Sequence, residues 1–243
     1  AAAYTAVDRA ESEAEAARAL NTRLPATLAR YAADHDIWLV HYSSDYVYPG
    51  TGTAPRTEDD QTGPLSNYGQ TKLDGDLAIQ QSGAKHLIFR TSWVYSARGH
   101  NFMKTMLRLG AEKESLNIVN DQHGSPTPAR LIAQATALAL HRVLTGPDAQ
   151  TLQGLYHLAP RGITNWHEFA QAIFHMASQQ GSAFKIDPTQ VHGIATQDYP
   201  TAAQRPLNSR LATTKLEQTF GLQLPDWREQ LHQTLTEYLQ KEK

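Results

Sequence analysis

The amino-acid sequence predicts an α/β fold in which a doubly wound parallel sheet carries helices on both faces. Apolar runs of strand length alternate with segments of helical periodicity along most of the chain. The apolar runs are continuous rather than interrupted at every second residue, which is typical of strands buried on both faces. The chain has 243 residues, of which 40% are hydrophobic, so a substantial core is available.

The expected strands and helices follow one another in order. Four apolar runs have the length of strands, and they occupy residues 37–43, 86–91, 116–119 and 155–158. Six segments have helical character, and they occupy residues 11–34, 68–81, 101–109, 128–144, 164–178 and 227–239. Pro25 interrupts the first helical segment, and Asp226 can cap the last. Residues 181–225 are rich in loops and prolines, which favours a subdomain that covers a substrate.

Composition and charge exclude several classes of protein. The chain has no cysteine, which excludes disulfide scaffolds, thiolate nucleophiles and Cys-ligated metals. Its 22 basic and 24 acidic residues give a net charge of −2 without a block of like charges, which argues against a nucleic-acid partner. No apolar run approaches the roughly 18–20 residues of a membrane span. We therefore expect a cytoplasmic protein. The eleven histidines show no metal-binding spacing, so we expect no metal site.

Tyr68 and Lys72 are the most specific pair of side chains, at the start of the helix expected over 68–81. Their i,i+4 spacing puts the phenol and the ammonium on one helical face. A unit charge about 4 Å away, at an effective dielectric of about 20, contributes about 4 kcal/mol, which lowers the pKa of a phenol by about three units. Such a phenol is a proton donor near neutral pH. The alternative is a surface Tyr and Lys that merely share a face.

Ser44 and Asp45 come directly after the first expected strand, where a parallel sheet places its ligands. The corresponding loops follow Ser43, Thr91 and Val119. A hydroxyl at Ser44 can hydrogen-bond the same carbonyl oxygen that Tyr68 protonates. The alternative is a Ser/Asp turn or a helix cap.

The order Ser44, Tyr68, Lys72 resembles the catalytic set of the extended short-chain dehydrogenase/reductases. Five motifs sharpen the resemblance, and they lie at residues 1–11, 41–48, 90–95, 120–127 and 205–211. Together they resemble the dTDP-4-dehydrorhamnose reductase family over essentially the whole chain. The resemblance implies a Rossmann-type sheet and the reduction of dTDP-4-dehydro-β-L-rhamnose to dTDP-L-rhamnose in dTDP-rhamnose biosynthesis. The hydride would come from NADPH or NADH.

The resemblance also implies roles for individual residues. Tyr68 would donate the proton, while Lys72 would tune Tyr68 and hold the nicotinamide ribose. Ser44 stands where the family usually has threonine, and we expect its hydroxyl to keep the catalytic role. Other residues would line the ligands: Ala3, Tyr4 and Thr5 the cofactor, and Ser44, Asp45 and Trp93 the sugar. Arg205 is expected at the pyrophosphate of the substrate, although a structural arginine beside a proline is at least as good an interpretation. A stabilising Mg²⁺ stays open.

The domain organisation follows from the same resemblance. Residues 1–159 are expected to form mainly the NAD(P)-binding domain, and residues 160–243 mainly the sugar-nucleotide subdomain, interleaved with loops near 93–127. A homodimer stays open. One alternative function is a non-catalytic, NADP-binding regulatory subunit of the same fold, similar to that of methionine adenosyltransferase. Another is a different sugar-nucleotide reductase or epimerase. A dehydratase is disfavoured because Tyr46 follows Asp45 where the dehydratases have glutamate.

One feature of the family is missing from this sequence. No Gly-x-x-Gly-x-x-Gly or Gly-x-Gly-x-x-Gly fingerprint occurs in the 243 residues. In the family that loop follows the first strand and binds the pyrophosphate of the cofactor. The sequence begins at what resembles the end of the family's fourth strand, so we expect that two βαβ-scale units, roughly 60 residues, are absent. The intact protein is then expected to be an active reductase, and this chain alone to be inactive, with an exposed apolar sheet edge.

The intact mass of the purified protein tests this expectation. We expect a mass about 6–7 kDa above the 26.9 kDa of this chain, for roughly 60 residues in two units. The same sample is expected to oxidise NADPH when dTDP-4-dehydrorhamnose is added. A mass close to 26.9 kDa would contradict the expected missing residues. The same mass without oxidation would mean a fragment that has lost its cofactor site, and the function would belong to its parent.

Overall fold

The computed structural model describes residues 2–241, which form two compact units. The first unit consists of residues 2–92, 136–158 and 201–222, and the second of residues 93–135, 159–200 and 223–241. Residues 201–222 therefore lie in the first unit, although the sequence groups them with 160–243. The reason is a set of backbone hydrogen bonds to residues 50–56, including Asn208 N to Gly50 O at 2.9 Å. The functions expected for the two parts stay predictions.

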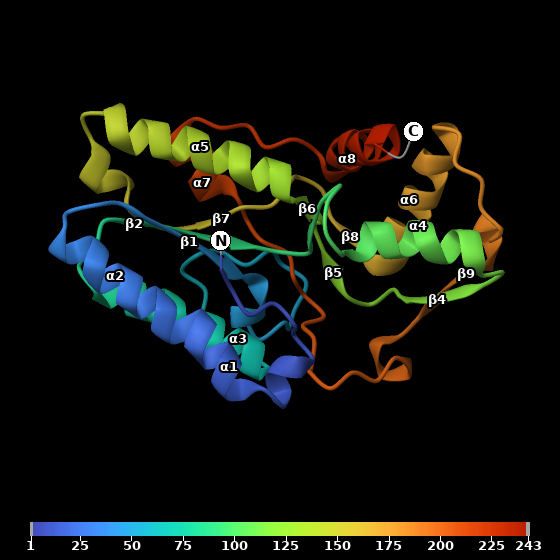
Figure 1. The fold of residues 1–243 in the computed structure, drawn as a ribbon, viewed down its shortest axis with the longest axis horizontal. Helices are drawn as coiled ribbons and strands as arrows, with labels where there is room; N and C mark the ends of the chain where they lie inside the picture. The colour runs from blue at the N-terminus through green and yellow to red at the C-terminus, as the bar shows by residue number, and fades with distance from the viewer. Residues whose placement is uncertain (1, 242–243) are drawn as a thin grey trace. The chain divides into compact units, whose positions relative to one another are not determined.

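The first unit is built on a parallel sheet of three strands (Figure 1). They are β1 (Leu39–Ser44), β2 (His86–Thr91) and β7 (Gly154–His157), in the order β1-β2-β7. Ser44 pairs with Thr91, so β1 and β2 end at the same edge. All six residues of β2 are buried, because it is the central strand. The parallel α/β fold predicted from the sequence is confirmed.

Helices cover both faces of this sheet. The segments α2 (Leu24–Asp34) and α3 (Asn67–Gln81) lie on one face, and the part of α5 (Ala129–Thr145) that belongs to this unit lies on the other (Figure 1). Tyr42 of β1 donates a hydrogen bond of 3.0 Å to Thr136 of α5. The unit also contains α7 (Thr214–Phe220), a helix that the sequence analysis leaves within a loop-rich stretch.

The helix expected over residues 11–34 is divided into shorter segments. A 3-10 turn (Arg9–Glu11) and α1 (Ala14–Arg18) come first, and a π-helical turn (Ala19–Arg23) separates α1 from α2. Pro25 explains the wide turn, because it has no backbone N–H for the carbonyl four residues earlier. That carbonyl belongs to Asn21, whose side chain is buried.

The second unit combines three complete helices and the first residues of α5 with short strand pairs. Its helices are α4 (Phe102–Glu112), α6 (Trp166–Gln179) and α8 (Trp227–Lys241). Its strands pair as β3 (Val94–Tyr95) with β6 (Thr127–Pro128), β4 (Leu116–Val119) with β9 (Val191–Ile194), and β5 (His123–Gly124) with β8 (Thr164–Asn165). The core gathers buried side chains of all three helices: Met103, Met106, Phe169, Ile173, Phe174, Trp227, Leu231 and Leu235 among them.

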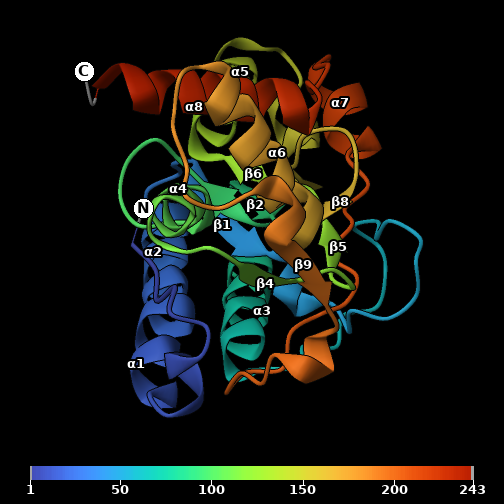
Figure 2. The ribbon, with the colours of Figure 1, turned by 90° about the vertical axis from the view of Figure 1, so that its right-hand side faces the viewer.

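The strand at 116–119 has the expected bounds but a different partner. It pairs in parallel with β9, outside the three-stranded sheet (Figure 2). The loop after Val119 therefore does not share an edge with the loops after β1 and β2. Within residues 2–241, no helix combines the length and the apolar character that crossing a membrane requires.

Gly75 lets α3 approach the π-helical turn closely. A Cβ at this position would lie 2.1 Å from the carbonyl oxygen of Asn21. Alanine is ordinarily about 1 kcal/mol better than glycine inside a helix. We nevertheless expect Gly75→Ala to lower the free energy of unfolding by about 1–3 kcal/mol, because overpacking outweighs propensity. Urea unfolding measures the change, with Gln80→Ala on the exposed side of α3 as the control. A Gly75→Ala protein as stable as the wild type would contradict the close approach.

Candidate active site

Ser44 and Asp45 lie at the carboxyl end of β1, where the chain enters a 3-10 turn (Asp45–Val47). Both residues are buried. The Ser44 hydroxyl accepts a hydrogen bond from Tyr46 N at 3.2 Å and donates one to Asp45 Oδ1 at 3.0 Å. The cap expected as an alternative is therefore present, and the same hydroxyl also meets a second group.

That second group is the phenol of Tyr68. The helix α3 begins at Asn67 because the Ser66 hydroxyl accepts a hydrogen bond from Gly69 N at 3.2 Å. Gly69 allows close contact with the turn after β1, since a Cβ there would lie 2.3 Å from the carbonyl oxygen of Tyr46. The Tyr68 phenol consequently lies close enough to Ser44 for the serine to influence the pKa of the phenol. The structure thus brings Ser44 and Tyr68 together at the sheet edge.

The pKa of Tyr68 moves in the direction opposite to the one expected from its spacing with Lys72. Burial raises the pKa of Tyr68 to about 12, and the charges of Asp45 and Asp76 add to the rise. The side chain of Ser44 opposes the rise. The reason for the difference is that Lys72 is directed elsewhere. At neutral pH the phenol therefore keeps its proton.

Lys72 is buried, with only 3% of its surface exposed. Its ammonium donates a hydrogen bond of 2.5 Å to the carbonyl oxygen of Tyr42, and it lies 3.4 Å from His41 Nε2. Burial lowers the pKa of Lys72, and the nearby carboxylate of Asp76 raises it. His41 and Asp76 were not singled out in the sequence, although Asp76 follows Lys72 by one helical turn.

The expected cofactor residues Ala3, Tyr4 and Thr5 lie along a segment held against α3. Tyr4 N donates to the side chain of Asn21 at 2.9 Å, and Asn21 Nδ2 donates back to Tyr4 O at 3.1 Å. The same Nδ2 lies 3.3 Å from the Thr71 hydroxyl, next to Lys72 in the chain. Ala3 and Thr5 are exposed. Asn21 is a polar residue inside a helical pattern, so no sequence signal marks it.

Arg205 has a structural partner in this fold. It forms an ion pair of 2.6 Å with Asp8, whose carboxylate also accepts a hydrogen bond from Ala203 N at 3.2 Å. The positive charge of Arg205 also lies close enough to Tyr46, the residue that follows Asp45, to oppose the rise in the pKa of that phenol. The interpretation of Arg205 as a structural arginine therefore gains support, while contact with a pyrophosphate stays a prediction.

Trp93 belongs to the second unit and has an unusual backbone conformation. Its φ is +50°, a region that bulky residues rarely adopt. Its indole stacks on that of Trp166, with ring centroids 4.0 Å apart. Trp166 Nε1 in turn donates to Gln122 Oε1 at 3.1 Å. These contacts fix the indole of Trp93 within its unit, and Trp166 is a residue that the sequence analysis does not single out.

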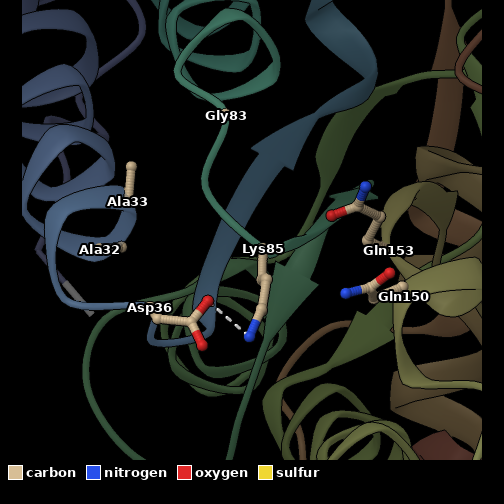
Figure 3. A pocket seen from close by; sticks show the side chains of 7 residues that line it. All are labelled: Ala32, Ala33, Asp36, Gly83, Lys85, Gln150 and Gln153. Carbon is tan, nitrogen blue, oxygen red and sulfur yellow. Dashed lines mark ion pairs between the residues drawn. The ribbon is translucent and has the colours of Figure 1, made fainter.

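Two further features bear on ligand binding. The described residues, 2–241, contain no cluster of three or more His, Cys, Asp or Glu side chains that could hold a metal. A surface cleft of about 210 Å³ opens near the amino ends of the strands, lined by Asp36, Lys85 and Gln150 among others (Figure 3). Asp36 and Lys85 form an ion pair of 2.6 Å there. None of the expected site residues lines this cleft.

The buried carboxyl of Asp45 makes stability depend on pH. Burial raises the pKa of Asp45 to about 6, against the lowering effects of Ser209 and Ser44. Its Oδ2 has no hydrogen bond of ordinary geometry among the described residues. A raised pKa means that the folded protein binds the proton more tightly, so this contribution is present below pH 4 and is lost as pH rises through 6.

We therefore expect Asp45→Asn to stabilise the protein at pH 8 by about 2–3 kcal/mol, as the shift in pKa implies. The gain should shrink between pH 6 and pH 4. Urea unfolding at several pH values measures it, with Asp59→Asn in the exposed loop as the control. A gain that does not change with pH would rule out the buried charge as its cause.

Comparison with known proteins gives the family. The family model described as "RmlD substrate binding domain" matches residues 1–240. The dTDP-4-dehydrorhamnose reductases of Salmonella typhimurium and Escherichia coli K12 are each 48% identical over 237 residues, which cover 98% of this chain and 78% of the relative. The reductase of Sinorhizobium fredii is 44% identical, covering 94% of this chain and 75% of the relative.

Solved structures agree with these relatives. A dTDP-4-dehydrorhamnose reductase from Bacillus anthracis, in complex with NADP, has a TM-score of 0.85 at 33% identity and covers 97% of this chain and 78% of its own. One from Clostridium acetobutylicum has a TM-score of 0.87 at 34% identity, with coverages of 98% and 79%. A dTDP-glucose 4,6-dehydratase from Streptomyces venezuelae, at 19% identity and a TM-score of 0.77, shares the fold. This chain belongs to the RmlD substrate binding domain family.

Proposed function

We propose that the protein reduces dTDP-4-dehydro-β-L-rhamnose to dTDP-L-rhamnose, with NADPH or NADH as the hydride donor. The observation that carries the proposal is the placement of Ser44 at the carboxyl edge of β1, close enough to Tyr68 to influence the pKa of the phenol. It occurs in a chain 48% identical to relatives named dTDP-4-dehydrorhamnose reductase.

Ser44 and Tyr68 complete the reduction by handling the oxygen of the carbonyl group. A bound nicotinamide supplies the hydride that attacks the C4 carbon and breaks the carbonyl π bond. The Ser44 hydroxyl hydrogen-bonds the oxygen, and Tyr68 gives it a proton, so that a C–H and an O–H bond form. Because burial keeps the phenol protonated at neutral pH, Tyr68 is ready to donate.

The residues present fit the nicotinamide end of the cofactor. The Lys72 ammonium has three N–H groups, of which Tyr42 O and His41 Nε2 take two among the described residues. The third can bind a ribose hydroxyl. Ala3, Tyr4 and Thr5 lie on the segment that Asn21 holds against α3, and they would line the cofactor. No glycine fingerprint for a pyrophosphate occurs in the 243 residues.

Asp45, Trp93 and Arg205 are proposed for the sugar nucleotide. Asp45 offers a carboxylate oxygen without a hydrogen bond beside Ser44, which suits a sugar hydroxyl. Trp93 offers an indole held by Trp166, which suits the apolar face of a sugar ring. Arg205 can reach a phosphate only if its ion pair with Asp8 opens. The proposal includes a cytoplasmic location and a homodimer, and light scattering of the purified protein tests the latter.

Tyr68→Phe removes the proton donor and keeps the ring. We expect turnover of dTDP-4-dehydrorhamnose by the intact protein to fall about 10²–10⁴-fold, with NADPH binding largely retained. Oxidation of NADPH followed by absorbance measures turnover, and fluorescence titration measures binding. Tyr156→Phe is the matched control, because that buried hydroxyl donates to Leu152 O at 2.7 Å and belongs to none of the expected site residues.

The outcome also separates the alternatives. Unchanged turnover in Tyr68→Phe would mean that another group is the acid. A wild-type protein that binds NADPH but does not oxidise it on addition of the sugar would support the regulatory subunit.

A further inference from the structure

Asp76 is a fully buried residue one helical turn after Lys72 on α3. Its Oδ2 accepts hydrogen bonds from Ser43 Oγ at 2.9 Å and from Arg90 Nε at 3.0 Å. Its Oδ1 has no hydrogen-bond partner among the described residues. A buried carboxylate oxygen without a donor costs free energy, so packing alone does not account for it.

His41 lies close to both Oδ1 and the lysine. Its Nε2 is 3.4 Å from Lys72 Nζ and 3.6 Å from Asp76 Oδ1. An ammonium group has donors only, so Nε2 presents its lone pair to Lys72 and has no proton for Asp76. Burial and the charge of Lys72 lower the pKa of His41 to about 3, in agreement with a neutral ring. The negative charge at Oδ1 therefore acts on Lys72 through space.

Lys72 needs such a charge because of where it lies. It is 3% exposed, and a buried ammonium without a counter-ion tends to lose its proton. The titratable groups that face it are His41 on β1 and Asp76 on α3, and Arg90 on β2 pairs with Asp76. His41 is neutral and Arg90 is positive. Asp76 is the anion of the group.

We propose that Asp76 is a positioning residue that keeps Lys72 protonated in its buried place. The proposal rests on the proposed function of Lys72, because a charged ammonium donates the hydrogen bond that holds the ribose of the cofactor. The alternative is that Asp76 only ties α3 to the strands through Ser43 and Arg90.

Titration of the lysine side chains by ¹⁵N NMR tests the proposal without the cofactor. The chain contains eight lysines, so the Lys72 signal can be assigned with Lys72→Arg. In the wild type we expect Lys72 to remain an ammonium at pH 7. In Asp76→Asn we expect its pKa to fall by about 1–2 units, the effect of one nearby charge at an effective dielectric of about 20.

Two variants serve as comparisons. Ser43→Ala removes one hydrogen bond of Asp76 without removing its charge, and it should leave the pKa of Lys72 unchanged. Asp76→Glu restores a carboxylate and should restore the pKa. A neutral Lys72 at pH 7 in the wild type would overturn the proposal, and this result needs no variant to fold. An equal pKa in the wild type and a folded Asp76→Asn would overturn it as well.

Activity gives an independent readout on the intact protein. The alkaline limb of kcat/KM should move to lower pH in Asp76→Asn and stay in place in Ser43→Ala. A purely structural Asp76 would lower activity at all pH values alike. If the NMR shift occurs in a protein without reductase activity, the proposed function fails and the role of Asp76 in charging Lys72 stands.

Discussion

The buried carboxylate of Asp76 fastens α3 to the sheet, and the geometry of the candidate site depends on that attachment. Asp76 binds Ser43 of β1 and Arg90 of β2. Arg90 Nη1 also donates a hydrogen bond of 2.8 Å to the Tyr48 hydroxyl. That hydroxyl lies 2.6 Å from His157 Nε2 on β7. One set of hydrogen bonds thus connects the helix to all three strands, so the helix that carries Tyr68 and Lys72 has a fixed place relative to Ser44.

Two glycines set how closely α3 approaches its neighbours. Gly69 lies against the carbonyl of Tyr46, and Gly75 against that of Asn21, at separations that no side chain allows. The first contact gives Tyr68 its reach to Ser44. The second brings the buried Asn21 side chain beside Thr71 and, through it, the segment around Tyr4. The parts of the site therefore depend on backbone packing as much as on the reactive side chains.

Local patterns in the sequence predicted the bounds of several strands and helices, because interactions between neighbouring residues determine those bounds. The bounds of β2 and β4, and α3 to within one residue at its start, follow from apolar periodicity. Contacts between distant segments were not predictable in this way. The four residues of β4 carry no signal for β9, and Arg205 meets a partner 197 residues earlier. The i,i+4 spacing placed Tyr68 and Lys72 on one helix but contains no information on burial, which decides the pKa of Tyr68.

The pKa of Tyr68 determines when the phenol gives up its proton. Burial and two carboxylates, Asp45 and Asp76, hold the proton on Tyr68, and Ser44 opposes them. The phenol therefore stays protonated until a stronger base is present beside it. A carbonyl oxygen becomes such a base only as hydride reaches the adjacent carbon, because the product of that step is an alkoxide. The raised pKa of Tyr68 thus prevents early loss of the proton to solvent. It favours transfer of that proton to the carbonyl oxygen during the reduction.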